Sequence, residues 1–113
     1  MSTYRVVFQV SRAGAEFFEA VLRNVRNVAA ELDDVAIRVI AHGDGIEFAT
    51  ARTSAESGVR SVLESGMDVW ACQNTLQRKG IAAEELLPGV RVVRAGLAEL
   101  VRSQHDGWAY VHP

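Results

Sequence analysis

Cys72 is the only cysteine in the 113-residue sequence, and its position suggests a chemical role. It closes the apolar run Met67–Cys72, and Asn74 has the residue type and position expected of the cap of a following helix. Backbone N–H groups and the dipole at a helix start favour a thiolate, which can hold a sulfur atom as a persulfide. A lone cysteine at the end of a buried strand is often only an apolar filler, and the sequence leaves both interpretations open.

His42 is a second residue with chemical potential, because it follows another apolar run and precedes Gly43-Asp44-Gly45. A histidine at the carboxyl end of a strand can act as an acid, a base or a donor to an anionic ligand. The Gly-Asp-Gly segment could form a backbone nest for an anion, but these residue types are also common in tight turns, and the turn is the favoured interpretation. The glycine spacing of a phosphate-binding loop or dinucleotide fingerprint is missing.

Asn24 and Asn27 lie three residues apart on a predicted helix and therefore share a neighbourhood on its surface. They could hydrogen-bond the sheet edge or a second subunit, although such side chains are more often solvated. No spacing of His, Cys and Asp resembles a metal site, and Ser11 lacks the surroundings of a hydrolase nucleophile. We therefore expect no metal ligands.

Short apolar runs alternate with segments of helical periodicity. The runs predict strands at Tyr4–Val10, Ala36–Ala41, Met67–Cys72, Val90–Val93 and Trp108–Val111. The periodic segments predict helices at Ala15–Leu32, Ser54–Glu64, Thr75–Lys79 and Leu97–His105, with a single turn at Ala83–Leu86. Thr53 and Glu56 have the spacing of a capping box, and Gly66 and Gly80 are placed to end helices.

This alternation predicts an α/β fold with a mostly parallel sheet and helices on both faces. Ligands of such sheets bind at the carboxyl ends of the strands, which directs attention to Ser11, His42 and Cys72. A chain of this length forms one domain, so residues 1–113 are expected to be a single unit.

The composition excludes several classes of protein. The net charge of −2 gives no basic excess for binding nucleic acid, and the apolar runs are too short to span a membrane. A single cysteine excludes an internal disulfide, and the N-terminus lacks the pattern of a secretory signal. We expect a cytoplasmic protein that binds neither nucleic acid nor membranes.

Several segments together resemble the DsrE/DsrF-like family over almost the whole chain. The cysteine-centred motif Ala71-Cys72-Gln73-Asn74-Thr75-Leu76 is specific together with a C-terminal block. That block comprises Leu87-Pro88-Gly89-Val90, Ala95-Gly96-Leu97-Ala98-Glu99-Leu100-Val101, Gln104, Gly107-Trp108-Ala109-Tyr110 and Pro113. The earlier segments Leu22-Arg23-Asn24-Val25-Arg26-Asn27 and Ala41-His42-Gly43 also fit. Arg94 departs from the pattern, because proline is expected before Ala95-Gly96.

The resemblance implies a three-layer α/β/α domain with a five-stranded, mainly parallel sheet, similar to the flavodoxin-like arrangement. It also implies homo-oligomers, commonly trimers or hexamers. Named members of the wider family take part in sulfur relay, in which a cysteine passes on sulfur as a persulfide.

Carried over to this sequence, the resemblance makes Cys72 the sulfur carrier, with no cofactor and with a donor or acceptor protein as partner. Asn74, Thr75 and Gly43 would shape its pocket, and His42 and Asn24 would be its neighbours. The alternatives are a binding module for a small anion or nucleotide-like ligand, and an oligomeric assembly protein with an inert cysteine. Flavin binding is not expected, because no phosphate-binding loop rich in Ser and Thr follows the first strand.

Overall fold

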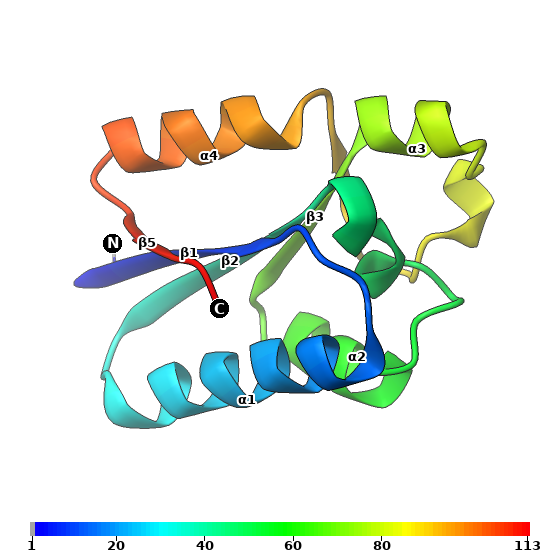
Figure 1. The fold of residues 1–113 in the computed structure, drawn as a ribbon. Helices are drawn as coiled ribbons and strands as arrows, with labels where there is room; N and C mark the ends of the chain where they lie inside the picture. Colours follow the sequence, from blue (N-terminus) through cyan, green and yellow to red (C-terminus); the bar gives the residue numbers. More distant parts are fainter. Residues whose placement is uncertain (1) are drawn as a thin grey trace.

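A five-stranded parallel sheet forms the centre of the computed structural model, which describes residues 2–113 (Figure 1). Its strands are β1 (Tyr4–Val10), β2 (Val35–Ala41), β3 (Asp68–Cys72), β4 (Arg91–Val93) and β5 (Ala109–Val111). They pair in the order β4-β3-β2-β1-β5, and each pair is parallel. This order differs from the 2-1-3-4-5 order of flavodoxin itself, although both folds have three layers.

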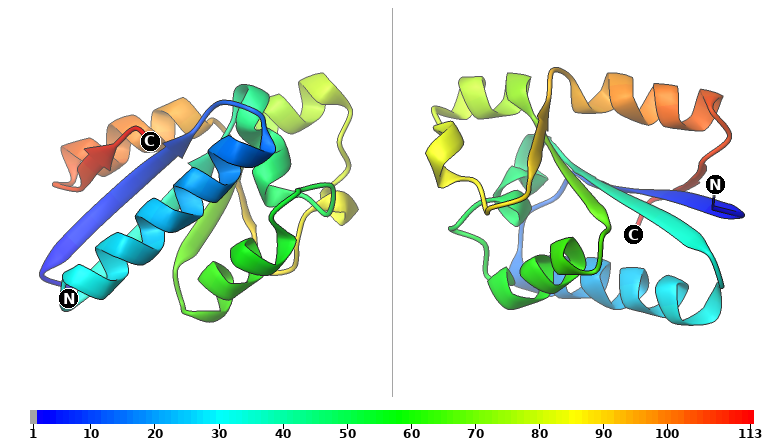
Figure 2. Two further views of the ribbon diagram at one scale, coloured as in Figure 1. Left: turned by 60° about the horizontal axis from the view of Figure 1, so that its bottom comes forward. Right: turned by 180° about the vertical axis from the view of Figure 1, so that it is seen from behind.

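The helices form the two outer layers. One face of the sheet carries α1 (Ala15–Glu31) and α2 (Glu56–Glu64), and the other carries α3 (Gln73–Lys79) and α4 (Gly96–His105) (Figures 1 and 2). Short 3-10 helices, η1 (Gly43–Ala49) and η2 (Ala83–Glu85), complete the chain. The three-layer α/β/α fold expected from the sequence is therefore confirmed. None of the helices in the described residues has the length and apolar character needed to cross a membrane.

Alternation along the strands divides the apolar side chains between the two faces. Odd and even positions of a strand point to opposite sides, so Val6, Phe8 and Val10 contribute to the core under α1 and α2. That core continues with Phe18, Val21, Leu22, Val25, Val39, Ala41, Ile46, Phe48, Val59, Val69, Ala71 and Leu87, among others. The opposite face holds a smaller cluster of Val7, Ile40, Trp70, Val93 and Leu100.

Two predicted helix starts are wrong. Helix α2 begins at Glu56 with Ala55 as its N-cap, and the Thr53 hydroxyl instead accepts the Ala55 N–H at 3.3 Å in a preceding turn. Helix α3 begins at Gln73, so Asn74 lies inside the helix and Cys72 itself is the N-cap residue. In both cases the tertiary path of the preceding segment fixes the start, against the local preference of a polar cap residue.

Gly43-Asp44-Gly45 opens the 3-10 helix η1, where the sequence favoured an isolated tight turn. Gly43 has φ of 56°, a left-handed conformation that glycine adopts without steric cost. At Gly45 a Cβ atom would lie 2.3 Å from the Val10 carbonyl oxygen, so only glycine fits there. These glycines let η1 turn sharply after β2 and lie against the carboxyl end of β1.

Candidate functional site

Cys72 lines a small cavity at the carboxyl ends of β2 and β3. The side chain is 5% exposed and lies on the sheet face that carries α3 and α4. The cavity has a volume of about 270 Å³, and its lining includes the predicted residues His42, Gly43, Cys72, Asn74 and Thr75. The structure thus brings together five of the six side chains or backbone positions predicted from the sequence.

Asn24 is the predicted residue that does not join them. It lies within α1, which covers the opposite face of the sheet (Figure 1), and it does not line the Cys72 cavity. The helical spacing of Asn24 and Asn27 fixes only which residues share a helix surface, whereas the handedness of the strand connections decides which face of the sheet that helix covers.

Polar groups at the starts of α3 and α4 influence the ionisation of Cys72. Burial raises the pKa of the Cys72 thiol, whereas the nearby backbone of Gly96, Thr75 and Asn74 and the Thr75 side chain lower it. The Asn74 N–H itself donates to the Arg94 carbonyl oxygen at 3.3 Å. Together the groups that lower the pKa outweigh burial and bring it below its ordinary value of 9.0. Because donors stabilise the anion and not the neutral thiol, the site favours a thiolate, the reactive form of cysteine.

Thr75 connects Cys72 to the start of η1. Its hydroxyl oxygen accepts the Gly43 N–H at 3.0 Å, while the hydroxyl also interacts with the Cys72 sulfur. A hydroxyl has one proton and two lone pairs, so accepting from Gly43 leaves its proton available to the sulfur. Gly43 therefore contributes to the site through its backbone N–H. Through this hydrogen bond, Thr75 links the start of η1 to the side of the cavity that holds Cys72.

Gly96, the first residue of α4, packs directly against the site. An added Cβ would lie 3.1 Å from the Cβ of His42 and 3.3 Å from the Cβ of Cys72, which is tighter than most contacts of that atom. The missing side chain lets the backbone N–H of Gly96 approach the sulfur. In the sequence, Gly96 is recognisable only as part of the C-terminal block of the family resemblance.

His42 is held by Gln9, a residue that the sequence analysis missed. The side-chain nitrogen Nε2 of Gln9 lies 3.0 Å from Nε2 of His42. Burial lowers the pKa of His42 below its ordinary value of 6.5, so the ring is neutral at neutral pH. The polar alternation of β1 gives no sign of this contact, because it depends on how β1 and β2 are registered.

Arg78 is a second residue that the sequence analysis missed. It lies one turn after Asn74 in α3, is exposed, and places a positive charge at the rim of the Cys72 cavity. Its position follows from the true start of α3 at Gln73, because residues four apart share one face of a helix.

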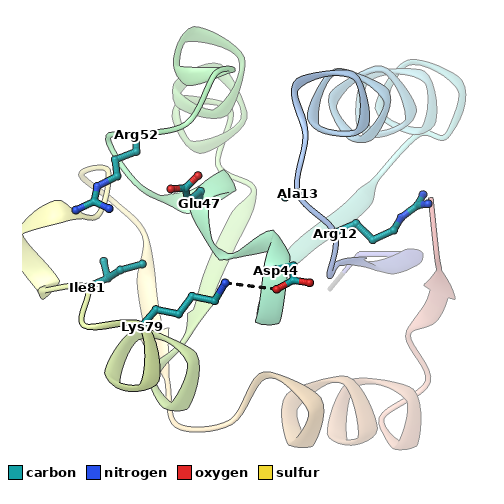
Figure 3. Close-up of a pocket in the computed structure, with 7 residues that line it drawn as sticks. All are labelled: Arg12, Ala13, Asp44, Glu47, Arg52, Lys79 and Ile81. Atoms are coloured by element: carbon teal, nitrogen blue, oxygen red, sulfur yellow. Dashed lines mark hydrogen bonds and ion pairs between the residues drawn. The ribbon is translucent and has the colours of Figure 1, made fainter.

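A larger cavity of about 440 Å³ lies beside η1 and is lined by charged side chains (Figure 3). Its cations are already engaged: Lys79 pairs with Asp44 at 3.4 Å, and Arg52 pairs with Glu85 at 2.6 Å. The Arg12 side chain points away from Lys79 in Figure 3, and its guanidinium lies 4.4 Å from the ring centre of Phe17. The lining of this cavity contains no cysteine or histidine, and the carboxylate of Glu47 has no ion pair among the described residues.

Among residues 2–113, no cluster of three or more His, Cys, Asp or Glu side chains is arranged to hold a metal ion. The Cys72 cavity itself presents a thiol of lowered pKa, a neutral imidazole and the hydroxyl of Thr75.

Solved structures of the same fold extend over nearly all of this chain. The MTH1491 protein of Methanobacterium thermoautotrophicum, whose function is unknown, is 35% identical, with a TM-score of 0.94 over 97% of this chain and 99% of its own. The BT1422 protein of Bacteroides thetaiotaomicron, also of unknown function, is 18% identical, with a TM-score of 0.76 over 96% and 94%. The ychN protein of E. coli is 16% identical, with a TM-score of 0.70 over the full length of both chains.

None of the curated proteins matches the sequence. The sequence model of the DsrE/DsrF-like family does match, over residues 6–113, which includes every residue of the Cys72 cavity. The fold agrees with that match in its five-stranded parallel sheet and in the order of its helices. The chain therefore belongs to the DsrE/DsrF-like family.

Proposed function

We propose that this protein carries sulfur as a persulfide on Cys72, as a component of a sulfur relay. The observation that carries the proposal is that Cys72 lines a cavity together with Thr75 and Gly96, a set of polar groups that lowers the pKa of its thiol. A cysteine that only filled space would need no such set, since an apolar environment suits a neutral thiol. The association of the DsrE/DsrF-like family with sulfur relay supports the same conclusion.

The proposed transfer needs no external oxidant. The Cys72 thiolate attacks the outer sulfur of a donor persulfide, R–S–SH; the new bond joins Cys72 to that sulfur, and the donor leaves as the thiolate R–S⁻. In the second half, an acceptor thiolate attacks the outer sulfur on Cys72, and Cys72 departs as a thiolate. The donors that stabilise the thiolate assist its departure, because a leaving thiol with a lower pKa leaves faster.

The burial of Cys72 is compatible with this role because the sulfur opens into the cavity. The cavity volume of about 270 Å³ exceeds the roughly 30 Å³ that one water molecule occupies in the liquid, so it can hold an outer sulfur atom. Exposed Leu97 and Arg78 lie at its rim, where a partner carrying a thiol would approach.

The proposal extends to assembly and location. We propose that the protein works in the cytoplasm as a homo-oligomer, a trimer or hexamer, and exchanges sulfur with a donor or acceptor protein. Leu97 and Val101, four residues apart on α4, are 61% and 66% exposed and offer an apolar strip for such contacts. Sedimentation equilibrium of the purified protein tests the oligomer, and a monomer at micromolar concentration would contradict it.

The test of the function is intact-mass analysis after incubation with glutathione persulfide. The wild-type protein should gain the mass of one sulfur atom and lose it on treatment with a thiol reductant. Because Cys72 is the only cysteine, Cys72→Ser removes every thiol and should gain nothing. Asn24→Ala, on the opposite face of the sheet, is the matched control and should gain sulfur as the wild type does.

Failure of the wild-type protein to gain sulfur, together with slow alkylation of native Cys72, would overturn the relay. The cavity would then be better explained as the binding site of a small anion, which a thermal shift with a panel of anionic metabolites detects. If no anion shifts the melting temperature, Cys72 is better explained as a packing residue of an assembly protein.

A further inference from the structure

A row of polar side chains crosses the sheet toward Cys72 on the face that carries α3 and α4. Tyr110 of β5 is registered with Val7 of β1, and Gln9 lies two residues after Val7, on the same face. Ile40 of β2 is registered with Gln9, and His42 lies two residues after Ile40. The same pattern reaches β3, because Ala41 pairs with Ala71 and the next residues are His42 and Cys72.

These side chains are joined by hydrogen bonds whose directions can be assigned. The Tyr110 hydroxyl donates to Oε1 of Gln9, and the NH2 group of the same amide faces His42. That nitrogen lies 3.0 Å from Nε2 of His42, and an amide nitrogen can only donate. Nε2 of His42 must therefore accept the bond, and the single proton of the neutral ring resides on Nδ1.

We propose that Gln9 and Tyr110 are positioning residues that hold His42 as the neutral tautomer with its proton on Nδ1, so that His42 donates a hydrogen bond to an anionic sulfur in the Cys72 cavity and does not act as a base. The proposal rests on the persulfide-carrier function for the identity of that anion. The assignment of the tautomer rests on the hydrogen bonds alone.

Two observations support a donor role over the Cys–His ion pair found in some thiol enzymes. The lone pair with which His42 would remove a proton is occupied by the Gln9 amide. The groups that lower the pKa of the Cys72 thiol belong to Gly96, Thr75 and Asn74, and His42 is not among them. The pKa of the Cys72 thiol is thus lowered without a contribution from His42.

His42 is nevertheless close enough to contact what Cys72 carries. The Cβ atoms of His42 and Cys72 both pack on Gly96, at 3.1 Å and 3.3 Å from the position that its Cβ would occupy. Both side chains also line the same cavity. Among residues 2–113, Nδ1 of His42 forms no hydrogen bond, which leaves its N–H for the outer sulfur or for the departing thiolate.

The first test is nuclear magnetic resonance of the His42 ring in isotopically labelled protein, with His42→Asn to assign the signals. The ring carbon and nitrogen shifts of the wild type should report the tautomer with the proton on Nδ1. Gln9→Glu should place a proton on Nε2, because a carboxylate can only accept from it. Tyr110→Phe should give a mixture of tautomers, since the Gln9 amide is then free to rotate.

Tyr4→Phe is the matched control, because Tyr4 is an exposed tyrosine at the opposite end of β1, and its spectrum should equal that of the wild type. A wild-type ring with its proton on Nε2, or a Gln9→Glu ring with no proton there, would overturn the assignment. Circular dichroism of each variant shows whether the fold is retained, which separates a changed tautomer from unfolding.

The second test is the rate of sulfur loading from glutathione persulfide. Gln9→Glu and Tyr110→Phe should load to completion but about tenfold more slowly, the effect of one misdirected hydrogen bond. If both load at the wild-type rate while the tautomer changes, the positioning role is wrong although the relay stands. If the wild type does not load while its ring carries the proton on Nδ1, the proposed function fails and the tautomer assignment survives.

Discussion

The two faces of the sheet are built on opposite principles. The face under α1 and α2 buries one large apolar core, whereas within residues 2–113 the face under α3 and α4 holds a cluster of five buried apolar residues, with Trp108 packed against them. On that second face a polar group lies at each end of the small cluster: Cys72 and His42 at the carboxyl ends of the strands, and Arg38 nearer the amino ends.

Arg38 shows how the second face tolerates a charge. Its guanidinium lies 4.0 Å from the ring centre of Trp70 and 3.9 Å from that of Trp108, and Nη1 donates to the Ser103 hydroxyl at 2.9 Å. Burial lowers the pKa of Arg38, and its Nε has no hydrogen-bond partner among the described residues. Aromatic faces thus replace part of the lost water.

The difference between the faces teaches that stability and chemistry are separated across the sheet. The strands are shared, but alternate residues serve the two tasks: Ala41 and Ala71 pack in the large core, and their successors His42 and Cys72 line the cavity. Substitutions on the first face should therefore change the free energy of unfolding, and substitutions around the cavity should change the behaviour of the thiol.

The largest expected effect lies on the first face. Phe18 of α1 is buried and packs edge-on against Phe48, with ring centres 5.3 Å apart. Phe18→Ala should lower the free energy of unfolding by about 3–5 kcal/mol, because it removes a large buried side chain and leaves a cavity. Urea unfolding measures the loss. The alkylation rate of Cys72 in the folded variant should equal that of the wild type. A severalfold change in that rate would show that the two faces of the sheet are not independent.

Gly96→Ala should affect both properties, because Gly96 packs on the polar end of the second face. The added Cβ would press on the Cβ atoms of His42 and Cys72, at 3.1 Å and 3.3 Å, and overpacking of this kind costs about 1–3 kcal/mol. Moving the Gly96 N–H away from the sulfur should also raise the pKa of the Cys72 thiol. Urea unfolding and the pH dependence of alkylation measure the two changes. Leu97→Ala, at the exposed residue that follows Gly96, should change the free energy of unfolding and the pKa of the Cys72 thiol by less.

Thr75→Val should separate the hydroxyl from the shape of the side chain. It leaves the Gly43 N–H without its acceptor, a loss on the order of 1 kcal/mol, and removes one donor from the sulfur. The pKa of the Cys72 thiol should therefore rise, which the pH dependence of the alkylation rate records. Thr75→Ser keeps the hydroxyl and should give the wild-type pH dependence of alkylation. If Thr75→Ser raises the pKa of the thiol as much as Thr75→Val does, the hydroxyl is not the cause of the lowered pKa.

The smallest expected effect is the dependence of stability on pH. Burial holds the pKa of His42 below 6.5, so its contribution to stability is complete above pH 6.5 and is lost as the pH falls through the folded-state pKa. Burial raises the pKa of the Cys72 thiol, but the donors outweigh it, so ionisation of Cys72 adds stability as the pH rises toward 9.0.

Both contributions predict a free energy of unfolding that increases with pH. Urea unfolding at a series of pH values should show that His42→Asn flattens the acid side of the profile and Cys72→Ser the alkaline side. Phe18→Ala should lower the whole profile without changing its slope, since it acts on the other face. If the free energy of unfolding still increases with pH in both His42→Asn and Cys72→Ser, other titratable groups cause the pH dependence.

Much of the fold could be predicted from local pattern. The strand Tyr4–Val10 was predicted with its true bounds, and α1 and α4 differ from their predicted ranges by one residue at one end. These elements carry long apolar periodicities, so a single ambiguous residue does not change the predicted element. The short helices α2 and α3 were placed less well because their starts depended on a single proposed cap, Thr53 or Asn74.

The candidate site was predicted where it depends on strand ends and missed where it depends on strand register. His42 and Cys72 follow from the rule that ligands bind at the carboxyl ends of parallel strands. Gln9 and Tyr110 lie 101 residues apart in the sequence, and nothing in either neighbourhood relates them. Asn24 was included on a family pattern, but its helix covers the other face of the sheet.

The sequence by itself determined the α/β class, the parallel sheet and the single cysteine, because hydrophobic periodicity and residue type are local properties of the chain. Only the tertiary structure decided that Gly96 and Thr75 lie beside Cys72, and that the Gln9 amide contacts the His42 ring. Those relations join elements from β1 to α4, and the direction of a hydrogen bond is fixed only when donor and acceptor are both in place.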